Sequence, residues 1–263
     1  MLKKQGKHAD KKLDAKLKKV IILKILLILF LIILIHSSIE IIKWYINNNQ
    51  NLNLKEELSS LVTINIISKE EQIEDEYKID FNSLKEMNQD AVAFLKVNGT
   101  NIEYFVVQGN DNQYYLNHSF DKSYNKAGWI FADYRNKLDG TDKNLIIYGH
   151  NRRNNSMFGT LENILKEEWY NNEKNRQIIF VTENESYTYE TFSVYKIEVE
   201  DEYIQTKFSE RAYVNFLTMI KSRSVVDFGI DVTSDDNILT LSTCADDSKY
   251  RIVLHAKRLN NES

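Results

Sequence analysis

The sequence predicts a mainly β domain with peripheral helices, joined to an N-terminal transmembrane helix. Three observations predict this class. An apolar run from Val20 to Ile39 is long enough to span a bilayer. Seven or eight short apolar segments follow from Asn101 onward, separated by turns rich in Asn, Gly and Asp. Two segments with helical apolar spacing interrupt them. This number of short strands favours a closed or nearly closed antiparallel sheet.

The apolar run has the features of an uncleaved anchor. Its only formal charge is Lys24, and twenty helical residues at about 1.5 Å each cover about 30 Å, the thickness of the hydrocarbon core. Trp44 and Tyr45 follow it, where aromatic residues meet the head groups. A cleaved signal peptide is the alternative, but His36-Ser37-Ser38 matches a cleavage site poorly. We therefore assign residues 20–42 to a transmembrane anchor.

The distribution of charge predicts the orientation of that anchor. Residues 1–19 contain eight Lys and two Asp, a net charge of +6. The whole chain carries −4, which leaves −10 for residues 20–263. The positive-inside rule then predicts a single-pass protein of the cell membrane, with a cytoplasmic tail over residues 1–19 and everything after the anchor outside. The acidic remainder argues against a nucleic-acid partner.

The part outside the membrane divides into a stalk and a globular domain. Residues 43–80 are polar and contain an acidic run, and we expect one or two helices there. Residues 81–263 form the predicted globular domain, which begins with a short helix over Ser83 to Asn88. The strands of this domain are expected at Asn101–Val107, Gly128–Phe131, Asn144–Tyr148, Gln177–Thr182, Tyr187–Val199 (as one strand or two), Ile238–Thr243 and Arg251–Ala256.

Two further helices are expected between these strands. The first covers Ser156 to Leu165, with Leu161, Ile164 and Leu165 on one face. The second follows a capping Ser209 and carries a buried stripe of Ala212, Tyr213, Phe216, Leu217 and Ile220. The sequence has no Gly-rich phosphate loop and no metal-ligand spacing, so we expect neither a cofactor nor a metal.

Cys244 is the only cysteine, so an internal disulfide is impossible and the thiol is either inert and buried or reactive. It ends the strand Thr240–Cys244, and a polar loop of six residues separates it from Arg251, which opens the next strand. If these strands pair as a hairpin, both residues lie at one rim of the sheet. A guanidinium there could favour the thiolate and also stabilise the oxyanion of an acyl-transfer intermediate.

A nucleophilic cysteine also needs a proton partner, and the chain has five histidines. His8 and His36 lie before or within the anchor. His255 is four residues past Arg251, about 13 Å along the same strand, and should point away from the rim. His118 and His150 remain, and the residues alone do not separate them. His150 directly follows a strand, which is a frequent position for catalytic groups.

Several spaced motifs resemble the sortase family. Thr240-Leu241-Ser242-Thr243-Cys244, followed by Arg251, is similar to the T-L-x-T-C…R signature of sortases. Further segments resemble class B members of the family. They are Ile147-Tyr148-Gly149-His150-Asn151 with Ser156–Leu161 after it, then Tyr104–Gly109, and then Tyr114–His118. The resemblance covers roughly residues 80 to 258.

This resemblance implies a fold and an activity. Sortases are eight-stranded β-barrel enzymes on the outer face of Gram-positive membranes. They are cysteine transpeptidases that cut the C-terminal sorting signal of a secreted protein after its threonine and pass the acyl group to an amine of the peptidoglycan precursor. The resemblance implies Cys244 as nucleophile, His150 as general acid and base, and Arg251 as oxyanion and substrate clamp. It also implies substrate contacts by Asn112, Leu116, Tyr148 and Ser242.

Three other functions stay open at this point. A pilin-polymerising sortase would use a pilin lysine as the acceptor. A membrane-tethered cysteine protease would use the same three residues and pass the acyl group to water. A non-enzymatic ectodomain would bury an inert Cys244.

Overall fold

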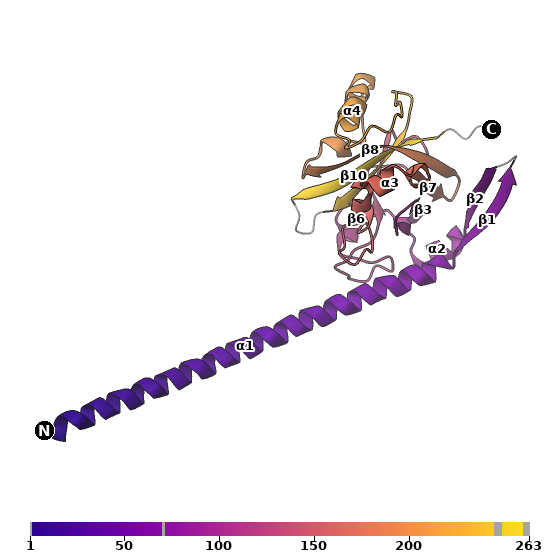
Figure 1. Ribbon diagram of the computed structural model, residues 1–263. Coiled ribbons are helices and arrows are strands. Elements are labelled where there is room, and N and C mark those ends of the chain that lie inside the picture. The colour runs from indigo at the N-terminus through magenta and orange to yellow at the C-terminus, as the bar shows by residue number, and fades with distance from the viewer. Residues whose placement is uncertain (1, 70–71, 245–248, 260–263) are drawn as a thin grey trace. The chain divides into compact units, whose positions relative to one another are not determined.

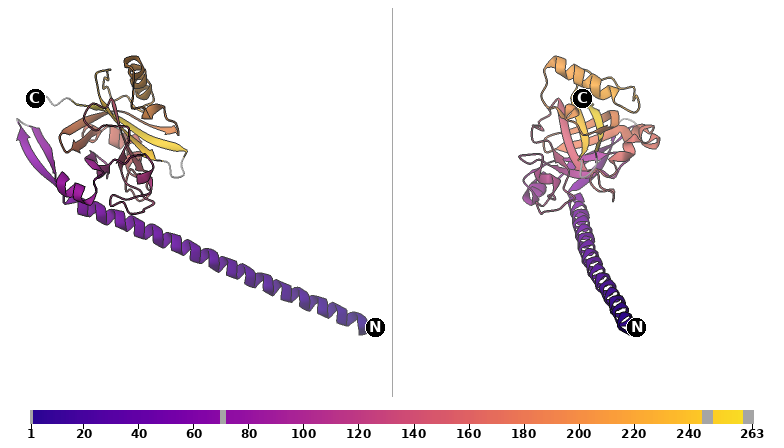
Figure 2. Two further views of the ribbon diagram at one scale, coloured as in Figure 1. Left: turned by 180° about the vertical axis from the view of Figure 1, so that it is seen from behind. Right: turned by 90° about the vertical axis from the view of Figure 1, so that its left-hand side faces the viewer.

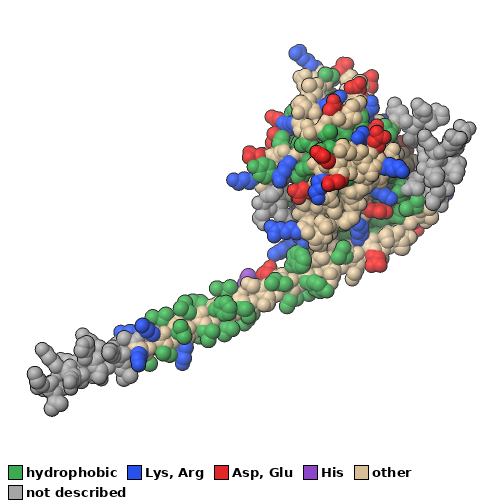
Figure 3. Space-filling view, viewed as in Figure 1, with side chains coloured by type: hydrophobic (Ala, Val, Ile, Leu, Met, Phe, Trp, Pro, Cys, Tyr) green, Lys and Arg blue, Asp and Glu red, His purple; other side chains and the backbone are tan. Residues whose placement is uncertain are grey.

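The computed structural model describes residues 2–69, 72–244 and 249–259, with side chains described for 16–64, 76–244 and 249–259. The chain forms two compact units, Met1–Asn49 and Gln50–Ser263. The first unit is the greater part of one long helix, α1 (Leu2–Ser59). Its segment from Lys16 onward is long and apolar enough to cross a membrane, and none of its most apolar stretch is buried. Hydrophobic side chains cover much of its surface in Figure 3. This helix therefore has the length and composition of a membrane anchor.

In its described residues, the second unit contains ten strands and several short helices, most of which are labelled in Figure 1. The strands are β1 (Val62–Lys69), β2 (Gln72–Ile79), β3 (Ala91–Val97), β4 (Glu103–Val107), β5 (Phe131–Ala132), β6 (Asn144–His150), β7 (Gln177–Thr182), β8 (Ser186–Glu198), β9 (Ile238–Cys244) and β10 (Tyr250–Arg258). The helices are α2 (Phe81–Met87), α3 (Glu167–Tyr170) and α4 (Glu210–Ser222), with 3-10 turns η1 (Tyr114–Leu116), η2 (Leu161–Leu165), η3 (Glu173–Arg176) and η4 (Glu202–Ile204).

Eight of these strands close into a barrel in the order β10-β8-β7-β3-β4-β5-β6-β9. The predicted closed eight-stranded sheet is confirmed. Its pairing is not wholly antiparallel, however, because β4 pairs with β5 and β6 pairs with β9 in parallel. A parallel pair needs a long crossover, and here β6 and β9 are connected through η2, α3, β7, β8 and α4. Figure 2 shows the barrel from two further sides.

The segment expected to be a stalk with one or two helices contains the end of one helix and, after it, a β-hairpin that was not expected. α1 continues to Ser59, where Leu54 and Leu58 are buried in the main hydrophobic core. β1 and β2 then pair antiparallel. Tyr77 of β2 accepts a hydrogen bond from Lys96 of the barrel at 2.9 Å. β2 is rich in acidic residues, which are depleted in strands, so its sequence does not indicate a strand.

The prediction missed one barrel strand and set another too early. β3 is buried on both faces, so it shows no alternation of apolar and polar residues that would mark a strand. The strand expected from Gly128 begins only at Phe131. Gly128 has a φ of +59°, outside the β region, so the ladder cannot extend back to it.

The expected helix from Ser156 is shorter than predicted. Met157 has a φ of +53°, and its backbone N–H donates to the hydroxyl of Tyr104 at 2.9 Å. Helical geometry therefore starts only at Leu161, in η2. The second expected helix is confirmed as α4, with the Ser209 side chain capping it. The prediction that Ala212 shares its buried face is wrong, because Ala212 is exposed.

A buried histidine joins the barrel strands beneath α4. His255 of β10 is fully buried, and its Nε2 lies 2.8 Å from the hydroxyl of Tyr195. Its Nδ1 lies 2.8 Å from Oγ1 of Thr240, which in turn donates to Asn144 at 2.6 Å. The Thr240 hydroxyl donates its only proton to Asn144, so it must accept from Nδ1. In the neutral ring, Nε2 then accepts from the Tyr195 hydroxyl. Burial, with the nearby charge of Arg223, lowers the pKa of His255 to about 3.

This pKa predicts a specific dependence of stability on acid. In the unfolded chain His255 takes up a proton near pH 6.5, whereas in the folded chain it stays neutral to about pH 3. Between these values the unfolded state binds more protons, so stability is lost as the pH falls. Urea unfolding should show that wild type loses about 1.4 kcal/mol more per pH unit than His255→Gln between pH 6 and 4. His118→Gln, a change at a half-buried histidine, serves as the control. Parallel profiles for wild type and His255→Gln would contradict this.

Candidate active site

Strand pairing brings three distant residues to one rim of the barrel. The parallel ladder between β6 and β9 places His150 directly opposite Cys244. The antiparallel ladder between β9 and β10 pairs Ser242 with Val253. This ladder ends two residues before Cys244 on β9 and two residues after Arg251 on β10, so both residues lie just beyond the same end of it. β6 and β9 end at this rim and β10 starts from it, so each residue lies at a strand terminus.

His150 is held at this rim by a backbone carbonyl. Its side chain is almost fully buried, and Nε2 lies 2.6 Å from the carbonyl oxygen of Leu116. A carbonyl oxygen only accepts, so this hydrogen bond puts a proton on Nε2. With Nε2 donating, only Nδ1 can change its protonation when the ring takes up or releases a proton.

Two features bring the Leu116 carbonyl close to His150. Gly128 has a φ of +59°, and a Cβ there would lie 2.9 Å from Cδ2 of His150 and 2.7 Å from the Leu116 oxygen. Only glycine allows the loop to approach so closely. On the other side, buried Asn51 of α1 donates to the Gly128 carbonyl at 3.1 Å and accepts from Asn125 at 2.9 Å. The last turns of α1 therefore help to hold the loop that orients His150.

A cleft of about 260 Å³ opens beside these residues. Cys244 and Arg251 line it. The four residues expected to contact substrate all line it as well, namely Asn112, Leu116, Tyr148 and Ser242. His150 is adjacent through its strand pairing but is not part of the lining. A larger cavity, of about 740 Å³, lies between α4 and the segment that follows it. It contains none of the residues expected to carry the chemistry, so the smaller cleft is the candidate site.

The other candidate histidine lies apart from this cleft. His118 stacks on Tyr114 with ring centroids 4.0 Å apart, and its Nδ1 lies 2.8 Å from the Tyr114 carbonyl oxygen. It does not line the cleft and has no strand pairing with Cys244. The structure therefore pairs His150, and not His118, with Cys244 across neighbouring strands.

Comparison with known proteins agrees with this geometry. A family model described as the sortase domain matches residues 95–259. The sortase B of Staphylococcus aureus is 36% identical over 239 residues, which is 89% of this chain and 96% of that protein. A solved S. aureus sortase B–substrate complex has a TM-score of 0.65 at 39% identity, over 69% of this chain and 85% of that one. A sortase B from B. anthracis has a TM-score of 0.72 at 33% identity, over 82% of this chain and 100% of that one.

The chain belongs to the sortase family, as a class B member. This class B sortase is a cysteine transpeptidase of the kind that anchors surface proteins. Across the described residues, no group of three or more His, Cys, Asp or Glu is placed to hold a metal ion.

The sequence analysis missed one wall of the cleft in this sortase. Tyr203 and Ile204, in the turn η4, line the cleft together with Glu200. The Tyr203 hydroxyl and the Ser242 hydroxyl lie 3.0 Å apart, so this wall contacts the strand that ends in Cys244. η4 is a single short turn in a polar segment, and neither apolar periodicity nor a motif in the sequence could have identified it.

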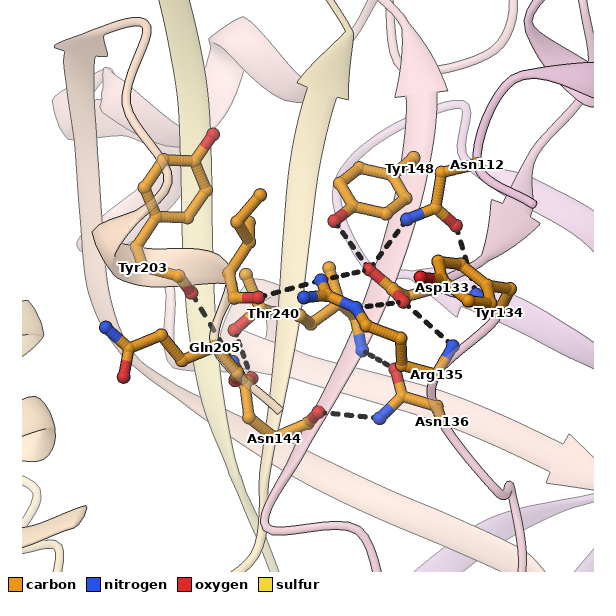
Figure 4. A network of polar contacts seen from close by, with 12 residues as sticks. Asn112, Asp133, Tyr134, Arg135, Asn136, Asn144, Tyr148, Tyr203, Gln205 and Thr240 are labelled. Carbon is orange, nitrogen blue, oxygen red and sulfur yellow. Dashed lines mark hydrogen bonds and ion pairs between the residues drawn. The ribbon is translucent and has the colours of Figure 1, made fainter. Parts of the chain in front are cut away.

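A second missed feature is a buried polar network under the cleft (Figure 4). Its centre is Asp133, which follows β5 and is fully buried. The carboxylate accepts hydrogen bonds from Asn112 and Tyr148, both at 2.9 Å, and from the Arg135 side chain at 2.6 and 2.8 Å. Burial and the Asp133 charge raise the pKa of Tyr148, so its hydroxyl stays protonated. The sequence could not reveal this network, because an isolated Asp after a strand is an ordinary turn residue.

Proposed function

We propose that this sortase cuts the C-terminal sorting signal of a secreted protein after threonine and transfers the acyl group to an amine of the peptidoglycan precursor. The observation that carries this proposal is the pairing of His150 with Cys244 in the β6–β9 ladder. This pairing puts a base and a thiol at the edge of a cleft that Arg251 also lines. Such an arrangement is suited to acyl transfer through a covalent intermediate.

The reaction follows in two halves from these three groups. The Cys244 thiolate attacks the carbonyl carbon of the scissile bond, and the Arg251 guanidinium stabilises the oxyanion that forms. The C–N bond then breaks, and His150 gives its proton to the leaving amine, which leaves a thioester on Cys244. The incoming amine attacks this thioester and gives a proton to His150. The C–S bond breaks, and the thiolate with imidazolium is restored.

The remaining cleft residues would hold the sorting peptide. Asn112 and Ser242 offer hydrogen-bonding groups, and Leu116 and Tyr148 offer apolar surface. The partners would be secreted proteins that carry the sorting signal, and an amine of the lipid-linked precursor in the cytoplasmic membrane.

We also propose the topology that the charge pattern predicts. Residues 1–19 would be cytoplasmic, 20–42 would cross the membrane, 43–80 would form the juxtamembrane stalk, and 81–263 would be the catalytic domain. Protease added outside cells stripped of their wall should digest the catalytic domain and leave the basic tail intact. A protected catalytic domain would contradict this orientation.

The test of the activity is an amine-transfer assay on the full chain in detergent. A peptide library identifies the sorting signal, and the products are then analysed by mass spectrometry with and without a nucleophilic amine such as triglycine. A transpeptidase gives the amide product after threonine. Release of acid alone would indicate a protease, and the acceptor preference between triglycine and a pilin-type lysine peptide separates wall anchoring from pilus assembly.

Arg251→Lys tests the proposed oxyanion clamp. Lysine keeps the charge but lacks the planar fork of donors, so we expect kcat/KM for transfer to fall by about 10²- to 10³-fold. Arg258→Lys is the matched control, because Arg258 is on the same strand but donates to the carbonyl of Gly140, away from the cleft. Transfer by Arg251→Lys at the wild-type rate would remove Arg251 from the proposed mechanism.

A further inference from the structure

Asp133 does not line the cleft, yet its hydrogen bonds lead to several residues that do. Its side chain is fully buried behind the cleft, so it cannot touch a bound peptide. Its carboxylate contacts Asn112 and Tyr148 on one side and Arg135 on the other. Any effect of Asp133 on substrate must therefore pass through these three residues.

On the first side, Asp133 determines how the polar groups of Asn112 and Tyr148 are oriented. A carboxylate only accepts, so Asn112 must turn its amide nitrogen toward Asp133. The Asn112 oxygen accepts from the backbone N–H of Tyr134 at 3.0 Å, which excludes the flipped amide. The Tyr148 hydroxyl donates its only proton to Asp133, so it can only accept a hydrogen bond from a peptide. The buried Asp133 carboxylate thus determines which groups of Asn112 and Tyr148 can donate or accept hydrogen bonds in the cleft.

On the second side, Asp133 reaches the wall formed by η4. Arg135 binds the carboxylate through Nε and Nη2, at 2.8 and 2.6 Å. The same Nη2 also donates to the carbonyl oxygen of Ile204 at 2.9 Å. Because a guanidinium is rigid and planar, fixing one edge of it on Asp133 fixes the position of Ile204 as well. One carboxylate is therefore connected to Asn112, Tyr148 and, through Arg135, Ile204, all of which line the cleft.

The charge that this connection needs is present at neutral pH. Burial by itself would favour the neutral acid. Hydrogen bonds from Arg135, Tyr148 and Asn112 outweigh burial and hold the pKa of Asp133 below its usual value. A carboxylate with this many donors is satisfied where it lies and has no need of a substrate group.

We propose that Asp133 is a positioning residue for the sorting peptide. It orients the hydrogen-bonding groups of Asn112 and Tyr148 and, through Arg135, holds the Ile204 wall at a fixed distance from them. This inference rests on the proposed peptide-transfer function. It concerns peptide binding and not the chemistry of the thiol, since the side chains that Asp133 holds, directly or through Arg135, belong to residues that line the cleft.

The experiment separates binding from chemistry in the full chain in detergent. Asp133→Asn removes the charge that holds Arg135 and keeps the size of the side chain. For the sorting peptide we expect KM to rise at least about tenfold, as the loss of one charge-assisted contact implies, while kcat changes less than about threefold. The alkylation rate of Cys244 by iodoacetamide should equal that of wild type. Asp142→Asn is the matched control and should keep the wild-type KM, because Asp142 caps the backbone of Lys137 and Leu138 away from the cleft.

A second variant keeps the inference testable if Asp133→Asn does not fold. Arg135→Lys leaves Asp133 in place but cannot bind it and Ile204 at once, and the Arg135 side chain is 34% exposed, which makes the change tolerable. Its KM should rise in the same way. A wild-type KM in the folded variants, or a fall of kcat and alkylation rate together with the change in KM, would overturn the inference.

A binding measurement distinguishes this outcome from failure of the proposed function. In a Cys244→Ala background, the Kd for a fluorescent sorting peptide reports on the cleft without any chemistry. If wild type cleaves no peptide in the library, the proposed function fails. If wild type is active and Asp133→Asn leaves this Kd unchanged, only the role of Asp133 fails.

Discussion

Replacing Cys244 by alanine is expected to lower transfer and cleavage of the sorting peptide by more than about 10⁴-fold, as removal of a covalent nucleophile does in other enzymes. No second thiol can take over, because Cys244 is the only cysteine of the chain. The side chain is half-buried at the end of β9, so its loss removes little packing and should not unfold the barrel. Mass spectrometry of the full chain, incubated with peptide, should detect the thioester adduct in wild type and not in the variant.

Two measurements make this result interpretable. The melting temperature and the Kd for the peptide should match those of wild type, which shows that the fold and the cleft survive the change. Turnover by Cys244→Ala above about a hundredth of the wild-type rate would show that another group performs the reaction.

The second large effect is expected for His150→Ala, which should lower kcat by about 10³-fold or more. The imidazole serves twice, since it supplies the proton to the leaving amine and accepts one from the incoming amine, and each role contributes about 10²- to 10⁴-fold in general acid–base catalysis. Steady-state kinetics of peptide transfer measures kcat, and iodoacetamide alkylation measures how far the reactivity of Cys244 falls when its proton partner is absent.

His118→Ala is the matched control for this experiment. It removes the same chemical group from a histidine that stacks on Tyr114 and does not line the cleft. It should transfer peptide at the wild-type rate. A large loss in His118→Ala with normal activity in His150→Ala would reverse the assignment of the proton partner.

The fold was predictable wherever a segment carried its own signal. β7 matches its expected limits, and β9 and β10 differ from theirs by two residues at most at either end. α4 follows from its apolar spacing and its capping Ser209. The prediction failed for strands whose formation depends on pairing or burial against other parts of the chain. β3 is buried on both faces and lacks a periodic pattern, and β2 is acidic and is a strand only because β1 pairs with it.

The sequence by itself determined the types of residue available for the chemistry. A lone cysteine at a strand end, an arginine opening the next strand and a histidine at the end of another are local features, readable from neighbours along the chain. The same is true of the apolar anchor and its basic flank, since both depend only on composition over consecutive residues.

Only the tertiary structure decided which of these residues meet. His150 and Cys244 are brought together by the parallel pairing of β6 and β9, which the chain connects through two other strands and several helices, and no local pattern encodes such a pairing. The cleft wall at η4 and the central role of Asp133 have the same origin, because a buried carboxylate acquires its function from the donors that the fold places around it.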